Sequence, residues 1–160
     1  MHINGVPLHP LVVHAVVVFV PLGALSAILF ALVPRWRWLL RWPTLVLALA
    51  GVVLTRTAVM TGNSLRNEKH FTGTLGDRIT THMNWGHRLE WSVWALAVVA
   101  VLAVWVLPYV VPLVGREARV SPMTSLVTTA TVLLPIAGVV VLVLAVITGD
   151  AGAKAVWKTT

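Results

Sequence analysis

The 160-residue chain contains no cysteine and few charged side chains. The absence of cysteine excludes disulfides, thiolate-bound iron–sulfur clusters and covalently attached haem. Charged residues make up 11% of the chain, whereas about a quarter of the residues in a soluble domain are charged. Hydrophobic residues make up 58%. These figures exclude an ordinary soluble domain and indicate an integral membrane protein.

Four continuous apolar runs supply the expected membrane spans, at about 11–33, 44–62, 89–114 and 125–148. Each run reaches the roughly 17–25 residues that carry a helix across the hydrocarbon of a bilayer. Backbone groups in lipid must be hydrogen-bonded internally, so we expect all four runs to be helical. The predicted fold class is an all-α integral membrane protein with four transmembrane helices, in a single membrane domain over residues 1–160.

The net charge of +7 comes mainly from basic side chains near the ends of the spans. Arginines in these positions are typical topology signals and lipid-headgroup contacts, so we expect a lipid bilayer as their partner and no nucleic acid. The short joints 33–43 and 109–123 are the segments densest in arginine. This density favours placing both joints on the cytoplasmic side of a bacterial plasma membrane, with the opposite, histidine-bearing face outward.

Two pairs of motifs repeat along the chain. HPLVVH at 9–14 opens the first span, and HMNWGH at 82–87 opens the third. AVMTGNS at 58–64 closes the second span, and AVITGDA at 145–151 closes the fourth. We interpret these repeats as two tandem helical hairpins related by a pseudo-two-fold axis along the membrane normal.

The repeats also predict the boundaries of the hairpins. Hairpin one covers about 9–63 and hairpin two about 82–150. A polar loop at about 63–84 joins them, and a short tail at 151–160 follows. An even number of crossings returns the third span to the side where the first began. We therefore expect all six histidines at one membrane face.

The histidine pairs predict a ligand site between the hairpins. Two side chains five residues apart on one helix differ in direction by about 140°, so neither pair can chelate one ion by itself. Pro10 favours the first helical position, which makes His9 a flanking residue and His14 the first histidine inside span one. We expect His14 and His87 to face each other across the bundle axis, with His9 and His82 as a second, shallower layer.

Two imidazoles that converge from facing helices are a usual arrangement for holding haem b. The predicted haem ligands are His14 and His87, and Arg56 and Arg88 are the predicted cofactor-binding cations. Arg56 lies six residues, roughly 9 Å, inside the end of span two. Because an intramembrane charge is costly unless it is paired, we expect Glu90 to be its partner. This pair could equally serve only to set the register of the bundle.

Several functions are compatible with these residues. The leading hypothesis is a membrane-embedded, b-type cytochrome-like electron-transfer module. A Zn, Cu or non-haem Fe site built from His14 and His87, with further ligands from His9, His82 or Asp150, is the first alternative. The second is an accessory subunit or membrane anchor without a cofactor. Since the sequence shows no nucleophile with its base and no phosphate loop, we expect an electron carrier or accessory subunit rather than an enzyme.

A transport role through Arg56 and Glu90 is a further alternative. One four-helix protomer can line a pathway only poorly, so this role would require a homo-oligomer.

Several features together resemble a bacterial four-helix membrane family of unknown function: HPLVVH, the basic tryptophan-rich joint, the histidine that opens span three and the ending ITGDAGAKAVW. The resemblance covers nearly the whole chain. Some relatives join this domain to a Rieske-type iron–sulfur domain, which implies a place near electron transfer and a redox or Rieske-type protein partner. The family pattern carries over to His9, Pro10, His14, His87, Gly149, Gly152, Ala153 and Trp157.

Overall fold

The computed structural model describes residues 2–3, 6–109 and 124–157. Its main elements are four long helices: α1 (Leu8–Leu32), α2 (Arg37–Lys69), α3 (Gly73–Val106) and α4 (Thr124–Trp157). The smaller elements are the antiparallel strands β1 (His2–Ile3) and β2 (Val6–Pro7) and the short 3-10 helix η1 (Pro34–Trp36). All four long helices are long and apolar enough to cross a membrane. The predicted all-α fold with four candidate spans is therefore confirmed.

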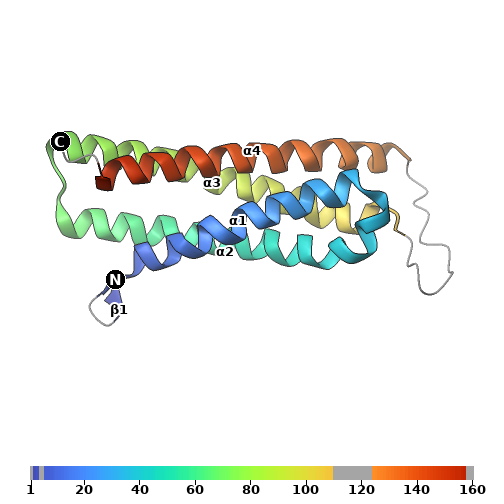
Figure 1. The fold of residues 1–160 in the computed structure, drawn as a ribbon, viewed down its shortest axis with the longest axis horizontal. Coiled ribbons are helices and arrows are strands. Elements are labelled where there is room, and N and C mark those ends of the chain that lie inside the picture. The colour runs from blue at the N-terminus through green and yellow to red at the C-terminus, as the bar shows by residue number, and fades with distance from the viewer. Residues whose placement is uncertain (1, 4–5, 110–123, 158–160) are drawn as a thin grey trace.

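The four helices lie side by side and run alternately up and down (Figure 1). Helix α1 packs against α2 and α4, and α3 packs against the same two helices, so α1 and α3 lie on a diagonal of the bundle. The start of α1, the α2–α3 connection and the end of α4 share one end of the bundle (Figure 1). All six histidines lie in segments at this end, which we call the histidine end.

Small side chains let the helices approach closely, as is common where lipid rather than water surrounds a bundle. On α1, Ala24 and Ala27 are fully buried, and Ala100 and Ala103 are fully buried on α3. At Gly138 of α4 an added Cβ would stand 3.0 Å from the Ala24 carbonyl oxygen. The outward faces carry valine and leucine instead, so the helices are apolar on all sides, as expected of segments in lipid.

The polar segment predicted as a loop at 63–84 is almost entirely helical, and this prediction is wrong. Helix α2 continues to Lys69, and α3 begins at Gly73. His70 ends α2 in the left-handed conformation, with φ 44°, and its backbone N–H donates to the Arg66 carbonyl. The change to polar residues thus marks where the helices leave the apolar zone, because polar side chains are compatible with a helix that continues into water.

The third span ends earlier than its apolar run predicts. The run was expected to reach residue 114, but α3 ends at Val106. Leu107 is extended, with ψ 127°, because the ring of Pro108 disfavours the helical conformation in the residue before it. Residues 110–114, and the rest of the predicted joint up to 123, lie outside the described residues.

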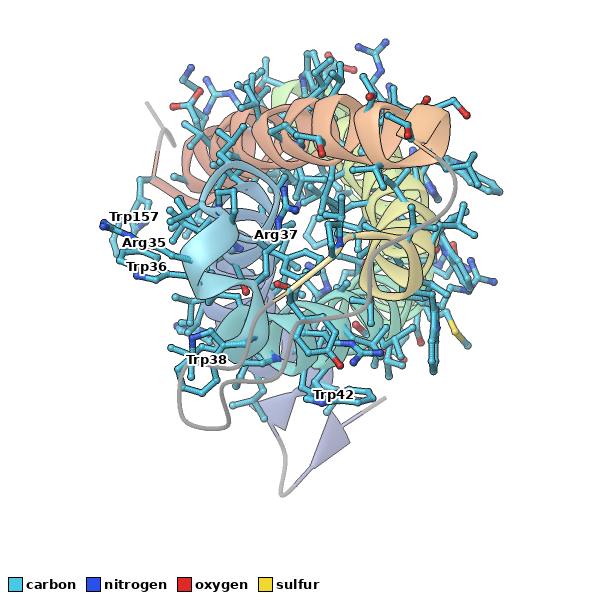
Figure 2. The ribbon with its side chains drawn as sticks, turned by 90° about the vertical axis from the view of Figure 1, so that its right-hand side faces the viewer. Arg35, Trp36, Arg37, Trp38, Trp42 and Trp157 are labelled. Carbon is cyan, nitrogen blue, oxygen red and sulfur yellow. The ribbon has the colours of Figure 1, made fainter. Side chains whose placement is uncertain are left out.

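At the opposite end of the bundle, Arg37 points inward while the neighbouring tryptophans lie on the outside (Figure 2). Arg37 is buried and donates to the carbonyls of Phe30, Ala31 and Pro108. It therefore satisfies carbonyls at the end of α1 that no helical N–H can reach. Trp36, Trp38 and Trp42 are exposed, as amphipathic rings are at a membrane interface.

Candidate histidine site between the hairpins

The two histidines that the structure brings together are His9 on α1 and His82 on α3. Their ring centroids are 6.3 Å apart and their planes meet at 72°. Both side chains are partly buried. Since α1 and α3 lie on a diagonal, the two rings approach each other across the bundle rather than along one helix-helix interface.

Each ring is hydrogen-bonded to the second helix of its own hairpin. His9 Nδ1 donates to the Ala58 carbonyl at 3.0 Å and lies 3.3 Å from Thr61 Oγ1, while His82 Nδ1 donates to the Thr148 carbonyl at 3.0 Å. A carbonyl oxygen can only accept, so both Nδ1 atoms carry the hydrogen. In a neutral ring this leaves Nε2 with a free lone pair, the tautomer that metal-ligating histidines commonly adopt.

Two glycines make room for these rings. A Cβ at Gly62 would stand 3.1 Å from His9 Cε1, and a Cβ at Gly152 would stand 3.0 Å from His82 Cε1. Each glycine comes four residues after the residue whose carbonyl accepts the ring, Ala58 or Thr148. The two hairpins therefore repeat one arrangement of ring, carbonyl and glycine.

The structural repeat is shifted from the sequence repeat. Aligning AVMTGNS with AVITGDA pairs Gly62 with Gly149, whereas the contacts pair Gly62 with Gly152. A Cβ at Gly149 would have no atom within 4 Å. The TG endings indicate the correct region, namely the end of the second helix in each hairpin. Which residue there meets the ring is decided by packing and not by the motif.

The expected inner pair, His14 and His87, is not the pair that meets; the rings that meet belong to the shallower pair, His9 and His82. His14 is exposed, and its Nδ1 donates to the Pro10 carbonyl of its own helix at 2.6 Å. The His87 side chain is 46% exposed. Helix α1 already begins at Leu8, so His9 is helical, and the turn of about 140° over five residues directs His14 away from it.

The predicted partnership of Arg56 with Glu90 is confirmed. Arg56 Nη1 lies 3.3 Å from Glu90 Oε1, and His87 Nδ1 lies 3.5 Å from Oε2 of the same carboxylate. Glu90 is buried, but its two partners are partly exposed on the surface of the bundle. The guanidinium of Arg88, the second predicted cofactor-binding arginine, lies over the Trp85 ring at 4.5 Å.

Two further features lie beside the histidine pair. Thr148 Oγ1 is buried and has no hydrogen-bond partner among the described residues. Gly86 lies one helical turn deeper than His82 on the same face of α3, and a Cβ there would meet nothing within 4 Å. Within residues 6–109 and 124–157, no group of three or more His, Asp or Glu side chains could share one metal ion. The site thus offers two imidazole nitrogens and some space.

The fold and the site define a four-helix, multi-pass membrane protein whose hairpins meet through a pair of histidines. The chain belongs to the family described as predicted membrane protein (DUF2231), which matches residues 5–160 and has no known function. This match confirms the resemblance to a membrane family of unknown function. No curated protein and no solved structure matches the chain.

Proposed function

We propose that this chain is a membrane-embedded, b-type cytochrome-like electron-transfer module in which His9 and His82 would hold one haem iron. The observation that carries the proposal is the matched hydrogen bonding of the two rings. Both hold their Nδ1 hydrogen on a backbone carbonyl, which leaves both Nε2 atoms free as ligands.

The separation of the rings supports a single metal between them. A metal–imidazole bond is about 2.0 Å long, so two imidazoles on opposite sides of one ion have their ring centroids about 6 Å apart. The observed separation of His9 and His82 is 6.3 Å.

The number of ligands favours haem iron over a bare ion. A structural zinc site takes four protein ligands, Cu(II) prefers four in a square, and non-haem iron commonly uses two histidines with a carboxylate. No group of three His, Asp or Glu side chains is available among the described residues. Haem iron needs at most two axial ligands from the protein, because the macrocycle supplies the other four.

The surroundings are compatible with a bound group at this position. Gly86 leaves open space on the inward face of α3, and Thr148 offers a buried hydroxyl beside His82. Arg88 is the proposed partner of the propionates, whereas Arg56 is already paired with Glu90. Bound haem would supply a one-electron carrier, and its potential would depend on His9, His82 and the hydrogen bonds that these rings make.

The proposal also includes a membrane location and a protein partner for this chain. The density of arginine in the joints supports a bacterial plasma membrane with the histidine end outward. The resemblance implies relatives fused to a Rieske-type domain, and such a fusion would favour a redox or Rieske-type protein as the partner.

A second candidate is an accessory subunit without a cofactor. The observation that favours it is that each histidine already links the two helices of its hairpin through a hydrogen bond. In that case His9 and His82 would serve assembly alone.

A reduced-minus-oxidised spectrum of detergent-purified protein from a haem-replete host tests these proposals. We expect Soret and alpha bands in the wild type, their loss in His9→Ala and His82→Ala, and their retention in His14→Ala and His70→Ala. Absence of haem bands from the wild type, with elemental analysis also finding no metal, would favour the accessory role. Bands that disappear in His14→Ala and His87→Ala but persist without His9 or His82 would overturn the ligand assignment.

A further inference from the structure

A second polar site lies on the α2–α3 side of the bundle, apart from the histidine pair. Its centre is the Glu90 carboxylate, whose side chain is 6% exposed. Arg56 from α2 contacts one carboxylate oxygen, and His87 from α3 contacts the other. Charged groups inside a membrane span are costly and usually mark functional sites, so this cluster is a candidate binding site.

Aromatic rings continue the same surface. His87, Glu90, Trp91 and Trp94 follow the spacing i, i+3, i+4 and i+7, which places them along one stripe of α3. Trp91 is 72% exposed and Trp94 is 44% exposed. Because Arg56 reaches Glu90 from α2, the stripe borders α2, and its exposed rings face outward from the bundle.

The depth of the cluster limits what can reach it. Glu90 lies eight residues, roughly 12 Å, further along α3 than His82. It also lies at the start of the apolar run of that helix, in a segment long and apolar enough to cross a membrane. A ligand for this surface would therefore be a molecule that dissolves in the bilayer.

The charged and polar groups of the cluster indicate which bilayer-soluble molecule could bind there. Arg56 donates hydrogen bonds, the Glu90 carboxylate accepts them, and the His87 imidazole can do either. An anionic lipid phosphate would be repelled by the carboxylate, and an apolar chain would leave the polar groups unsatisfied. A neutral, flat head group with both carbonyl and hydroxyl oxygens matches the polar groups and can stack on exposed tryptophan rings.

We propose that Arg56, His87, Glu90 and the adjacent tryptophans bind the head group of a lipid-soluble quinone or quinol. A quinone carbonyl would accept a hydrogen bond from Arg56, and a quinol hydroxyl would donate one to Glu90. The choice of a redox carrier among bilayer-soluble molecules rests on the electron-transfer function proposed above. The site would give that function its membrane-soluble electron donor or acceptor.

Binding of a benzoquinone with a short alkyl tail tests this site, measured as saturable quenching of tryptophan fluorescence in purified protein. We expect Glu90→Gln and Arg56→Gln to weaken the affinity about tenfold or more, which corresponds to about 1.4 kcal/mol. Arg35→Gln, which removes an exposed arginine at the opposite end of the bundle, is the control and should leave the affinity unchanged. If Glu90→Gln does not fold, His87→Asn keeps the Arg56–Glu90 pair and is expected to weaken binding several-fold.

The outcomes separate this site from the haem proposal when both spectra and quenching are recorded on the same preparation. Haem bands with no saturable quenching, or with equal affinity in all variants, overturn the quinone site alone. Saturable quenching that the variants weaken, in protein without haem bands, supports the site and overturns the haem proposal.

Discussion

Gly62 lies so close to the ring of His9 that a single added methyl group would stand 3.1 Å from the ring's Cε1 atom. The same relationship joins Gly152 to His82 in the second hairpin, at 3.0 Å. Each ring is thus confined between a carbonyl that accepts its Nδ1 hydrogen and a helix surface without a side chain. The positions of both rings depend on these two glycines.

Alanine at these glycines is therefore expected to destabilise the protein. Glycine to alanine within a helix ordinarily gains up to about 1 kcal/mol, but overpacking a close contact typically costs about 1–3 kcal/mol. We expect Gly62→Ala and Gly152→Ala to lower the midpoint of thermal unfolding in detergent. Gly149→Ala is the matched control, because its added Cβ meets no atom within 4 Å, and it should leave the midpoint equal or higher. Equal effects at all three glycines would contradict the proposed confinement of the rings.

Removing the buried guanidinium of Arg37 should weaken the opposite end of the bundle. Arg37 donates to the Phe30 and Ala31 carbonyls at 3.2 and 2.8 Å and to the Pro108 carbonyl at 3.3 Å. Arg37→Met would leave these carbonyls without that donor, and we expect a loss of about 2–4 kcal/mol in the free energy of unfolding. Arg35→Met removes an exposed arginine two residues away and should change it little. Denaturant titration in mixed micelles would measure both.

The ion pair between Arg56 and Glu90 predicts a non-additive pair of substitutions. Arg56→Met leaves a buried carboxylate with only His87 as partner, so we expect a loss of about 1–3 kcal/mol. The double variant Arg56→Met with Glu90→Gln has no buried charge to leave uncompensated, and it should be more stable than Arg56→Met alone. A double-mutant cycle on the free energy of unfolding checks this. Strictly additive losses would show that the two side chains are not coupled.

The proposed orientation can be read from cysteine labelling, since the natural chain has no cysteine to interfere. Thr74, in the first turn of α3, is exposed at the histidine end, and Trp36 is exposed at the opposite end. We expect Thr74→Cys to react with a membrane-impermeant maleimide in intact cells. Trp36→Cys should react only after the membrane is permeabilised. The reverse pattern would place the histidine end in the cytoplasm.

The sequence by itself determined the fold class and one side-chain partnership. In an apolar run long enough to span a bilayer, the backbone N–H and C=O groups can be hydrogen-bonded within the run only if it is helical. The number and order of the four helices therefore follow from the positions of the apolar runs. Glu90 is the one acidic residue within the predicted spans, which left Arg56 a single intramembrane partner of opposite charge. The repeated motifs also identified the end of the bundle at which the histidines gather.

Only the tertiary structure decided which histidines meet. Each residue of a helix turns the side-chain direction by about 100°, so His9 and His14 lie on different faces of α1, and only packing decides which of these faces turns inward. Helix α1 begins at Leu8, and its packing against α2 directs His9, not His14, toward His82. Packing likewise decided which glycines receive the rings, because Gly149 and Gly152 are only three residues apart on α4 and an added Cβ would meet the His82 ring at Gly152 alone.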